Sequence, residues 1–265
     1  MGGGFFMHAG KSNIGMSIKI EELALEPQII YQDEHYVAIN KPAGLLVHRS
    51  MIDRHETRFA LQMVRDHLRQ RVYPVHRLDK PTSGVLIFAL SQDVARMTMP
   101  VFSSKQVKKR YVAIVRGFTQ EHDIIDYPLK EQLDKIADAN AQQDKDAQEA
   151  VTAYQRLNTV ELPFSVGRYK SARYSLIELL PETGRKHQLR RHMKHIFHPV
   201  VGDTSHGDGR HNQLFREQFD CHRLMLHASE LSFTCPQKQT AISIHAPYDD
   251  TWLKLLREFD WSIES

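Results

Sequence analysis

The feature that most constrains the fold of this chain is a succession of short apolar segments, each of strand length and bounded by polar or turn-forming residues. These segments arrive in runs and do not alternate strictly with helical segments, which favours an antiparallel sheet over a doubly wound parallel one. The expected strands lie at 29–31, 36–40, 73–78, 84–90, 110–116, 151–157, 174–180, 224–233 and 241–245. The sequence therefore predicts an α+β fold with a mixed, mainly antiparallel central sheet flanked by helices and loops.

Four segments between these strands have helical periodicity, most clearly 59–68, where apolar residues recur three to five positions apart. Pro100 is expected to bend or end the second helix, and Asp249 or Asp250 is a suitable N-cap for the last. The expected helices lie at 56–70, 92–103, 185–195 and 250–259.

The chain has 265 residues, which is enough to bury the core of one large domain. Residues 1–25 show no periodicity and predict a flexible N-terminal tail. Residues 131–150 hold six acidic residues and two lysines, which predicts a polar surface insertion. We therefore expect a single domain over 26–265.

Charge is distributed unevenly, although the net charge is only +3. Residues 41–80 carry nine Lys or Arg against four acidic residues, a local charge of +5. Residues 165–198 carry eight against two, a local charge of +6. Two such segments fit either a surface that binds a polyanion or ordinary solvated faces, and charge alone leaves both interpretations open.

Composition excludes several classes of protein. A content of 25% charged and 41% hydrophobic residues is not typical of a disordered chain. No segment approaches the roughly 18 consecutive apolar residues of a membrane span, and the N-terminus lacks the pattern of a secretory signal. Because Cys221 and Cys235 cannot form a disulfide framework, we expect a cytoplasmic protein with no membrane partner.

Two cofactor motifs fail on inspection. Residues 10–12, Gly-Lys-Ser, resemble the end of a phosphate loop, but the first glycine would fall at Phe5 and no strand precedes it. Four histidines lie within 187–198. A zinc site usually adds cysteine or carboxylate ligands at close spacing, and Asp203, beyond the expected helix, is the only acidic residue near these histidines. We expect hydrogen-bonded or surface histidines, no metal and no nucleotide.

The most informative segment is His76–Ala89, His-Arg-Leu-Asp-Lys-Pro-Thr-Ser-Gly-Val-Leu-Ile-Phe-Ala. Two apolar strands flank a turn in which Asp79 stands between Arg77 and Lys80. A turn on a rigid scaffold is a favourable place for a reactive carboxylate, and neighbouring cations favour its ionised form. A capping aspartate in an ordinary turn has the same local pattern, so spacing alone leaves both roles open.

This segment resembles the signature of the pseudouridine synthases of the RluA type, in which the catalytic aspartate lies in His-Arg-Leu-Asp-x-x-Thr-Ser-Gly. Other segments resemble the same family in the same order. They are Asn-Lys-Pro-Ala-Gly at 40–44 with Val-His at 47–48, Lys-Arg-Tyr-Val-Ala at 109–113, Thr-Gly-Arg-Lys-His-Gln-Leu-Arg at 183–190, His-Pro-Val-Val-Gly-Asp at 198–203 and Arg-Leu-Met-Leu-His-Ala at 223–228. The resemblance covers about 28–247.

The resemblance implies an isomerase that converts uridine to pseudouridine without cofactor or metal. It implies that Asp79 acts beside the sugar, either as a nucleophile or as a base, that Tyr111 stacks on the uracil, and that Arg190 pairs with Asp79. Arg77 matches the arginine that fills the space left by an extruded base. The other expected substrate contacts are Lys80, Arg185, Lys186, His187 and Arg191. A wider set of expected phosphate contacts adds Lys41, Arg49, Arg54, Arg168, Lys170, Arg173 and Lys194.

The sequence is closer to one branch of the family, which modifies uridine 65 in a tRNA stem. We therefore expect a monomeric enzyme that binds tRNA and has no S4-like RNA-binding module. Three alternatives stay open at this point: a pseudouridine synthase that acts on ribosomal RNA, a tRNA-binding folding chaperone without catalytic activity, and a metal hydrolase built on the histidines.

Overall fold

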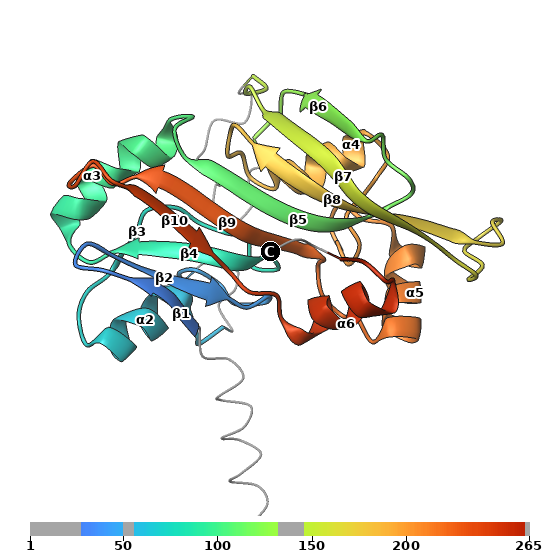
Figure 1. Ribbon diagram of the computed structural model, residues 1–265, viewed down its shortest axis with the longest axis horizontal. Helices are drawn as coiled ribbons and strands as arrows, with labels where there is room; N and C mark the ends of the chain where they lie inside the picture. Colours follow the sequence, from blue (N-terminus) through green and yellow to red (C-terminus); the bar gives the residue numbers. More distant parts are fainter. Residues whose placement is uncertain (1–27, 50–55, 132–145, 263–265) are drawn as a thin grey trace, which may run out of the picture.

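A computed structural model describes residues 28–49, 56–131 and 146–262 (Figure 1). The expected tail at 1–25, most of the insertion expected at 131–150, and Arg54 lie outside the described residues. No helix in the described part of the chain is long and apolar enough to cross a membrane.

The described strands form one ten-stranded sheet. They are β1 (Gln28–Gln32), β2 (Tyr36–Lys41), β3 (Tyr73–Pro74), β4 (Ser83–Ala89), β5 (Lys108–Arg116), β6 (His122–Asp126), β7 (Val151–Leu162), β8 (Ala172–Pro181), β9 (Leu226–Thr234) and β10 (Ala241–His245). The order across the sheet is β1-β2-β4-β9-β5-β8-β7-β6, with β10 also paired to β9 and β3 to β4. Only β4 and β9 pair in parallel among these strands, so the predicted mixed, mainly antiparallel sheet is confirmed.

Helices flank both halves of this sheet. They are α2 (Ala60–Leu68), α3 (Gln92–Ser103), α4 (Gln188–His195), α5 (Gly209–Phe219) and α6 (Asp250–Glu258). In Figure 1, α2 and α3 lie beside the half that contains β1 to β4, and α4, α5 and α6 lie beside the other half. The aromatic side chains of Tyr174, Phe215 and Trp252 are fully buried where α5 and α6 pack against β8. The predicted α+β class is therefore confirmed.

The strand predicted at 73–78 is wrong beyond Pro74. β3 pairs with β4 only through Tyr73 and Pro74, after which the backbone leaves the sheet. The Nε2 atom of His76 then accepts a hydrogen bond from the backbone N–H of Ile87 at 3.1 Å, in place of a strand carbonyl. Burial lowers the pKa of His76 to about 3, which keeps the imidazole neutral and able to accept this bond.

Two helices begin later than predicted. Phe59 is extended, so α2 begins at Ala60. His187 has a left-handed backbone conformation with φ of 56°, so α4 begins only at Gln188. Pro100 does not end α3, which continues to Ser103. Asp249 caps α6 as one of the two predicted residues, and its side chain accepts a hydrogen bond from Trp252 N.

Two elements were not predicted, β6 and α5. β6 reads His-Asp-Ile-Ile-Asp and is an edge strand with four of its five residues exposed, so its pattern is mostly polar. α5 reads Gly-Arg-His-Asn-Gln-Leu-Phe-Arg-Glu-Gln-Phe, in which apolar residues appear only in the second half. Asp208 caps α5, and its side chain accepts a hydrogen bond from Arg210 N.

The two halves of the sheet meet at a short parallel contact. Ser83 and Gly84 of β4 pair with His227 and Ala228 of β9. Gly84 has φ of +113°, a backbone conformation that residues other than glycine rarely adopt. This junction begins four residues after Asp79 and holds the Asp79 turn at the middle of the sheet.

Candidate active site

The Asp79 turn is supported by backbone hydrogen bonds. Thr82 N donates to the carbonyl of Asp79 at 3.1 Å, which closes the turn. Gly44 N donates to the carbonyl of Lys80 at 2.8 Å and ties the turn to the loop that follows β2. The Asp79 side chain is 23% exposed, so its carboxylate is sheltered but open to a ligand.

Arg190 of α4 joins two carboxylates. Its Nε and Nη2 atoms donate to Asp203 at 2.7 and 2.8 Å, and its Nη1 atom lies 3.4 Å from Asp79 Oδ2. The Arg190 side chain is only 4% exposed and that of Asp203 is fully buried. A guanidinium with five fixed donors suits this double role, because two edges of the same group serve two acceptors.

Asp203 is itself held by the backbone that follows it. Its Oδ1 atom accepts hydrogen bonds from Ser205 N and His206 N, each at 2.9 Å. Burial raises the pKa of Asp203, but the hydrogen bonds from Arg190 and the backbone outweigh burial, so the pKa lies below its ordinary value. An ionised Asp203 therefore anchors Arg190 while Nη1 remains directed at Asp79.

Two histidines complete this cluster. His187 Nε2 lies 3.9 Å from Asp79 Oδ2, and His187 Nδ1 lies 3.0 Å from His206 Nε2. Burial lowers the pKa of His187, opposed by the negative charge of Asp79, and burial also lowers the pKa of His206, to about 4. Both imidazoles are therefore mainly neutral at neutral pH.

Tyr111 approaches the site from β5. It packs against the apolar clusters on both sides of the central junction. Burial raises the pKa of Tyr111, and the negative charge of Asp79 raises it further. Its hydroxyl is therefore protonated at neutral pH, beside the carboxylate.

The prediction that Lys41 contacts phosphate is wrong. Lys41 is instead a buried support for the turn. Its side chain is fully buried, and Nζ donates to the carbonyls of Pro42, Leu45 and Lys80 at 2.9, 2.8 and 3.1 Å. Burial lowers the pKa of Lys41 to about 7, Arg223 lowers it and Asp79 opposes the change. No pattern in the sequence indicates that this lysine is internal.

A further polar network lies behind the turn. Arg223 Nη2 donates to Ser83 Oγ at 2.5 Å, and Arg223 Nη1 forms an ion pair with Asp249. Ser83 Oγ also lies 2.8 Å from His227 Nδ1. These contacts connect the start of β4 to the segment before α6, so two distant parts of the chain support the Asp79 turn.

The other predicted contacts surround this cluster at different depths. Arg77 is exposed, and Lys80 forms an ion pair with Glu56 at 2.9 Å. Arg185 and Lys186 are exposed before α4, where Arg185 Nε donates to the Glu149 carbonyl at 3.0 Å. Arg191 is partly buried in α4.

Three predicted phosphate contacts lie elsewhere. Arg168, Lys170 and Arg173 are at or near the end of the β7–β8 hairpin where Leu162 pairs with Ala172. Tyr111 pairs with Leu179, further along β8. At about 3.3 Å per residue, the hairpin end is roughly 20 Å from the level of Tyr111, so these cations are not part of the cluster.

A basic hollow lies beside α2 and the start of β3. It measures about 360 Å³, and its lining includes His48, Arg49, Arg65 and Arg71. Burial lowers the pKa of His48, and the charge of Arg77 lowers it further.

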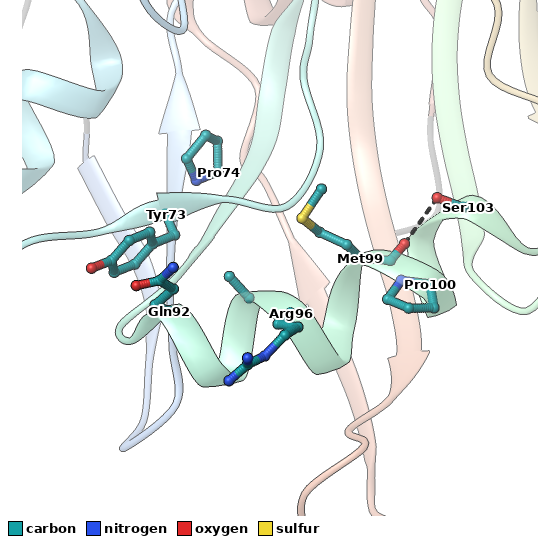
Figure 2. A pocket seen from close by; sticks show the side chains of 8 residues that line it. Tyr73, Pro74, Gln92, Arg96, Met99, Pro100 and Ser103 are labelled. Carbon is teal, nitrogen blue, oxygen red and sulfur yellow. Dashed lines mark hydrogen bonds between the residues drawn. The ribbon is translucent and has the colours of Figure 1, made fainter.

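Another hollow, of about 580 Å³, lies between β3 and α3 (Figure 2). Tyr73 faces one side of α3, from which Gln92, Arg96 and Met99 project (Figure 2). Because Tyr73 pairs with Ala89, this hollow lies at the end of β4 away from the Asp79 turn. Arg96 is the one charged side chain in its lining, so the hollow offers little for catalysis.

The histidines of 187–198 have separate partners. His192 contacts Thr152 Oγ1 at 3.0 Å, His195 stacks on Tyr127, and His198 Nδ1 lies 2.8 Å from the carbonyl of Arg116. No group of three or more His, Cys, Asp or Glu in the described residues is arranged to hold a metal ion.

Comparison with known proteins identifies the family of this chain. A family model described as RNA pseudouridylate synthase matches residues 35–195, a segment that includes Asp79, Tyr111 and Arg190. The chain belongs to this family. Two relatives are both called tRNA pseudouridine synthase C. The protein from Vibrio parahaemolyticus is 58% identical over 240 residues, 91% of this chain and 98% of that protein. The protein from Pasteurella multocida is 56% identical over 238 residues, 90% of this chain and 98% of that protein.

Solved structures of pseudouridylate synthases share the fold. Human RNA Pseudouridylate Synthase Domain Containing 4 superposes with a TM-score of 0.68 at 26% identity, covering 95% of this chain and 100% of that one. Human RNA Pseudouridylate Synthase Domain Containing 1 gives a TM-score of 0.65 at 23% identity, covering 91% and 86%.

Within this pseudouridylate synthase, sequence reasoning missed the roles of Asp203 and His206. A signal for Asp203 was present, because a buried arginine requires a carboxylate partner and Asp203 was recognised as the only acid near the histidines of 187–198. His206 had no comparable signal, because its contact with His187 depends on the path of the loop after Asp203.

Proposed function

We propose that this chain is a tRNA pseudouridine synthase that isomerises uridine 65 in the tRNA stem. The observation that carries the proposal is the Asp79 carboxylate at 3.4 Å from the buried Arg190 guanidinium, with Tyr111 beside it. High identity to proteins named tRNA pseudouridine synthase C, over 98% of their length, supports tRNA as the substrate.

The reaction breaks the bond between the sugar and N1 of uracil, turns the base and joins the sugar to C5. It needs a carboxylate beside the sugar, which acts either as a nucleophile on the anomeric carbon or as a base toward the 2′ proton. Asp79 suits both routes. Among the described residues, both polar contacts of its side chain fall on Oδ2, so Oδ1 is the oxygen available to the sugar.

Arg190 supplies a positive charge to this carboxylate in a site that must hold a base away from water. Because Asp203 already occupies two of its N–H groups, Arg190 is held in orientation before the substrate arrives. Such preorganisation is what makes a charged partner effective in catalysis.

Tyr111 has two tasks in this proposal. Its ring stacks on the uracil, and its protonated hydroxyl lies near C5, from which a proton must leave. A protonated hydroxyl can move the C5 proton only as a relay: its oxygen takes up the proton that leaves C5 while its own proton passes to Asp79 or to water.

A uridine in a stem must be extruded before any of this chemistry, at a cost of a few kcal/mol. Arg77 is exposed beside Asp79 and fills the vacated space. The arginines of the basic hollow, with Arg185 and Lys186, contact the phosphate backbone. Lys80 and Arg191 also belong to the proposed substrate contacts.

Further features complete the proposal. Residues 26–265 form one catalytic domain with a polar insertion at 131–150, and the enzyme works as a monomer without cofactor or metal. Cys221 and Cys235 are both free and buried, which suits the reducing cytoplasm in which tRNA is modified.

The test compares wild type with Asp79→Asn on a tRNA transcript and on ribosomal RNA. A chemical probe specific for pseudouridine should detect product at position 65 of tRNA with the wild-type enzyme, and none with Asp79→Asn. Binding of tRNA should survive the substitution, since Asn preserves the shape of the side chain. If product formed only in ribosomal RNA, ribosomal RNA would replace tRNA as the proposed substrate. If the wild type bound tRNA but formed no product, a folding chaperone would be favoured.

A further inference from the structure

The paired imidazoles of His187 and His206 stand at the end of a polar chain that reaches Asp79. His187 Nδ1 and His206 Nε2 are 3.0 Å apart, and both rings are mainly buried. His187 Nε2 faces Asp79 Oδ2 at 3.9 Å, the same oxygen that Arg190 contacts. The pair is therefore built into the site and is not a surface feature.

The carboxylate selects one tautomer of this pair. Two neutral imidazoles share a single proton across the contact between their nitrogens. If His187 Nδ1 donated to His206, the lone pair of His187 Nε2 would face the negative Asp79 Oδ2. If His206 Nε2 donates, His187 Nε2 carries its proton toward Asp79, which is the favourable arrangement.

Other charged groups around the pair do not reverse this choice. Arg190 and Lys186 lower the pKa of His187, while Asp79 and Asp203 raise it. Lys194 and Arg190 lower the pKa of His206, and Asp203 raises it. With burial added, both rings stay neutral at neutral pH, so a single N–H of His187 is available to Asp79.

We propose that His206 orients His187, and that His187 then holds Asp79 Oδ2 so that Oδ1 meets the substrate sugar. His187 is thus a positioning residue that acts through Asp79, and not primarily a phosphate contact. The 3.9 Å distance shortens to a hydrogen bond when substrate closes the site, as catalytic contacts often do. This inference rests on the proposed function.

Two substitutions at His187 separate the roles of its nitrogens. In His187→Gln the amide nitrogen takes the place of Nε2 and still donates to Asp79. In His187→Asn the amide group takes the place of Nδ1, so it reaches His206 but not Asp79. His187 has a left-handed backbone, which Asn tolerates better than Gln, so backbone preference would favour the Asn variant.

The experiment measures single-turnover rates on a tRNA transcript between pH 5 and 8.5, together with the Kd for tRNA. We expect His187→Gln to stay within a few-fold of wild type. His187→Asn should lose about tenfold or more in rate with an unchanged Kd. A loss of rate at an unchanged Kd is the result that separates positioning of Asp79 from binding of the RNA.

A second pair of variants guards against a folding defect. His206→Gln keeps a donor at the position of Nε2, whereas His206→Leu does not, and neither residue touches Asp79 directly. We expect the rate and pH profile of His206→Leu to follow those of His187→Asn, and His206→Gln to resemble wild type. Matching far-UV circular dichroism and melting temperatures identify variants that fold normally.

Three outcomes would contradict the inference or the proposed function, and they can be told apart. A wild-type rate and pH profile in both His187→Asn and His206→Leu overturn the inference alone. A weakened Kd with an intact rate at saturating tRNA overturns it in favour of a phosphate contact. Failure of the wild-type enzyme to form pseudouridine overturns the proposed function, and the inference with it.

Discussion

Gly84 lies so close to the backbone of Ala228 that a Cβ on Gly84 would stand 2.2 Å from the Ala228 carbonyl oxygen. The contact is part of the parallel pairing of β4 with β9, where the two halves of the sheet join. Because Gly84 follows Asp79 by five residues, this close approach also sets the position of the Asp79 turn.

We predict that Gly84→Ala lowers the free energy of unfolding by roughly 2 to 5 kcal/mol, combining a left-handed backbone with a steric clash. Gly44→Ala is the matched control, because Gly44 also has a positive φ of +86° but has nothing within 4 Å of an added Cβ. It should lose only about 1 to 2 kcal/mol. Urea unfolding measures both, and equal losses would show that the contact with Ala228 is unimportant.

The burial of Lys41 leads us to predict that the stability of the protein depends on pH. Burial lowers its pKa from 10.5 to about 7, so between these values the unfolded chain binds more protons than the folded one. The free energy of unfolding contributed by Lys41 therefore rises with pH across this window and is constant below it. Lys41→Met should lack this slope. The hydrogen bonds that it loses lower the free energy of unfolding by an amount that does not depend on pH.

Urea unfolding of wild type and Lys41→Met at several pH values between 6.5 and 10 measures the difference. Other titrating groups cancel in the subtraction, so a wild-type advantage that grows with pH is expected. Parallel curves would mean that the ammonium stays protonated among its carbonyl acceptors.

Much of the sheet could be predicted because strand-forming segments leave a local pattern. The helix at 92–103 and the strand at 241–245 have the predicted bounds. The segment 75–78 is apolar enough for a strand, but the His76 imidazole takes over a hydrogen bond that a strand would make. A side chain that substitutes for backbone is invisible to periodicity.

The candidate site divides in the same way. Asp79, Tyr111 and Arg190 were predicted because their motifs resemble a known family, and they do lie together in the structure. Lys41 was misjudged, because a lysine in a basic segment looks like a surface residue until its burial is known. The His187–His206 contact is long-range, so no local pattern reports it.

Tyr111→Phe should bind tRNA normally and lose turnover. The ring of Phe still stacks on the base, whereas the protonated hydroxyl that burial and Asp79 maintain is gone. We expect the single-turnover rate to fall by about a hundredfold or more, as when a proton-transfer group is removed. Quenched-flow assays of pseudouridine formation measure it, and normal kinetics would leave Tyr111 with stacking alone.

The role proposed for Arg77 predicts that the effect of Arg77→Ala on the reaction rate depends on whether the target uridine is base-paired. If its side chain fills the space left by the extruded uridine, Arg77→Ala should slow a transcript with a paired target by at least about tenfold. A transcript whose target uridine is mismatched should be slowed much less, because extrusion is then easier. Lys80→Ala is the control, since Lys80 pairs with Glu56 beside the same turn and should affect both transcripts alike. An equal loss on both transcripts with Arg77→Ala would assign Arg77 to backbone contact instead.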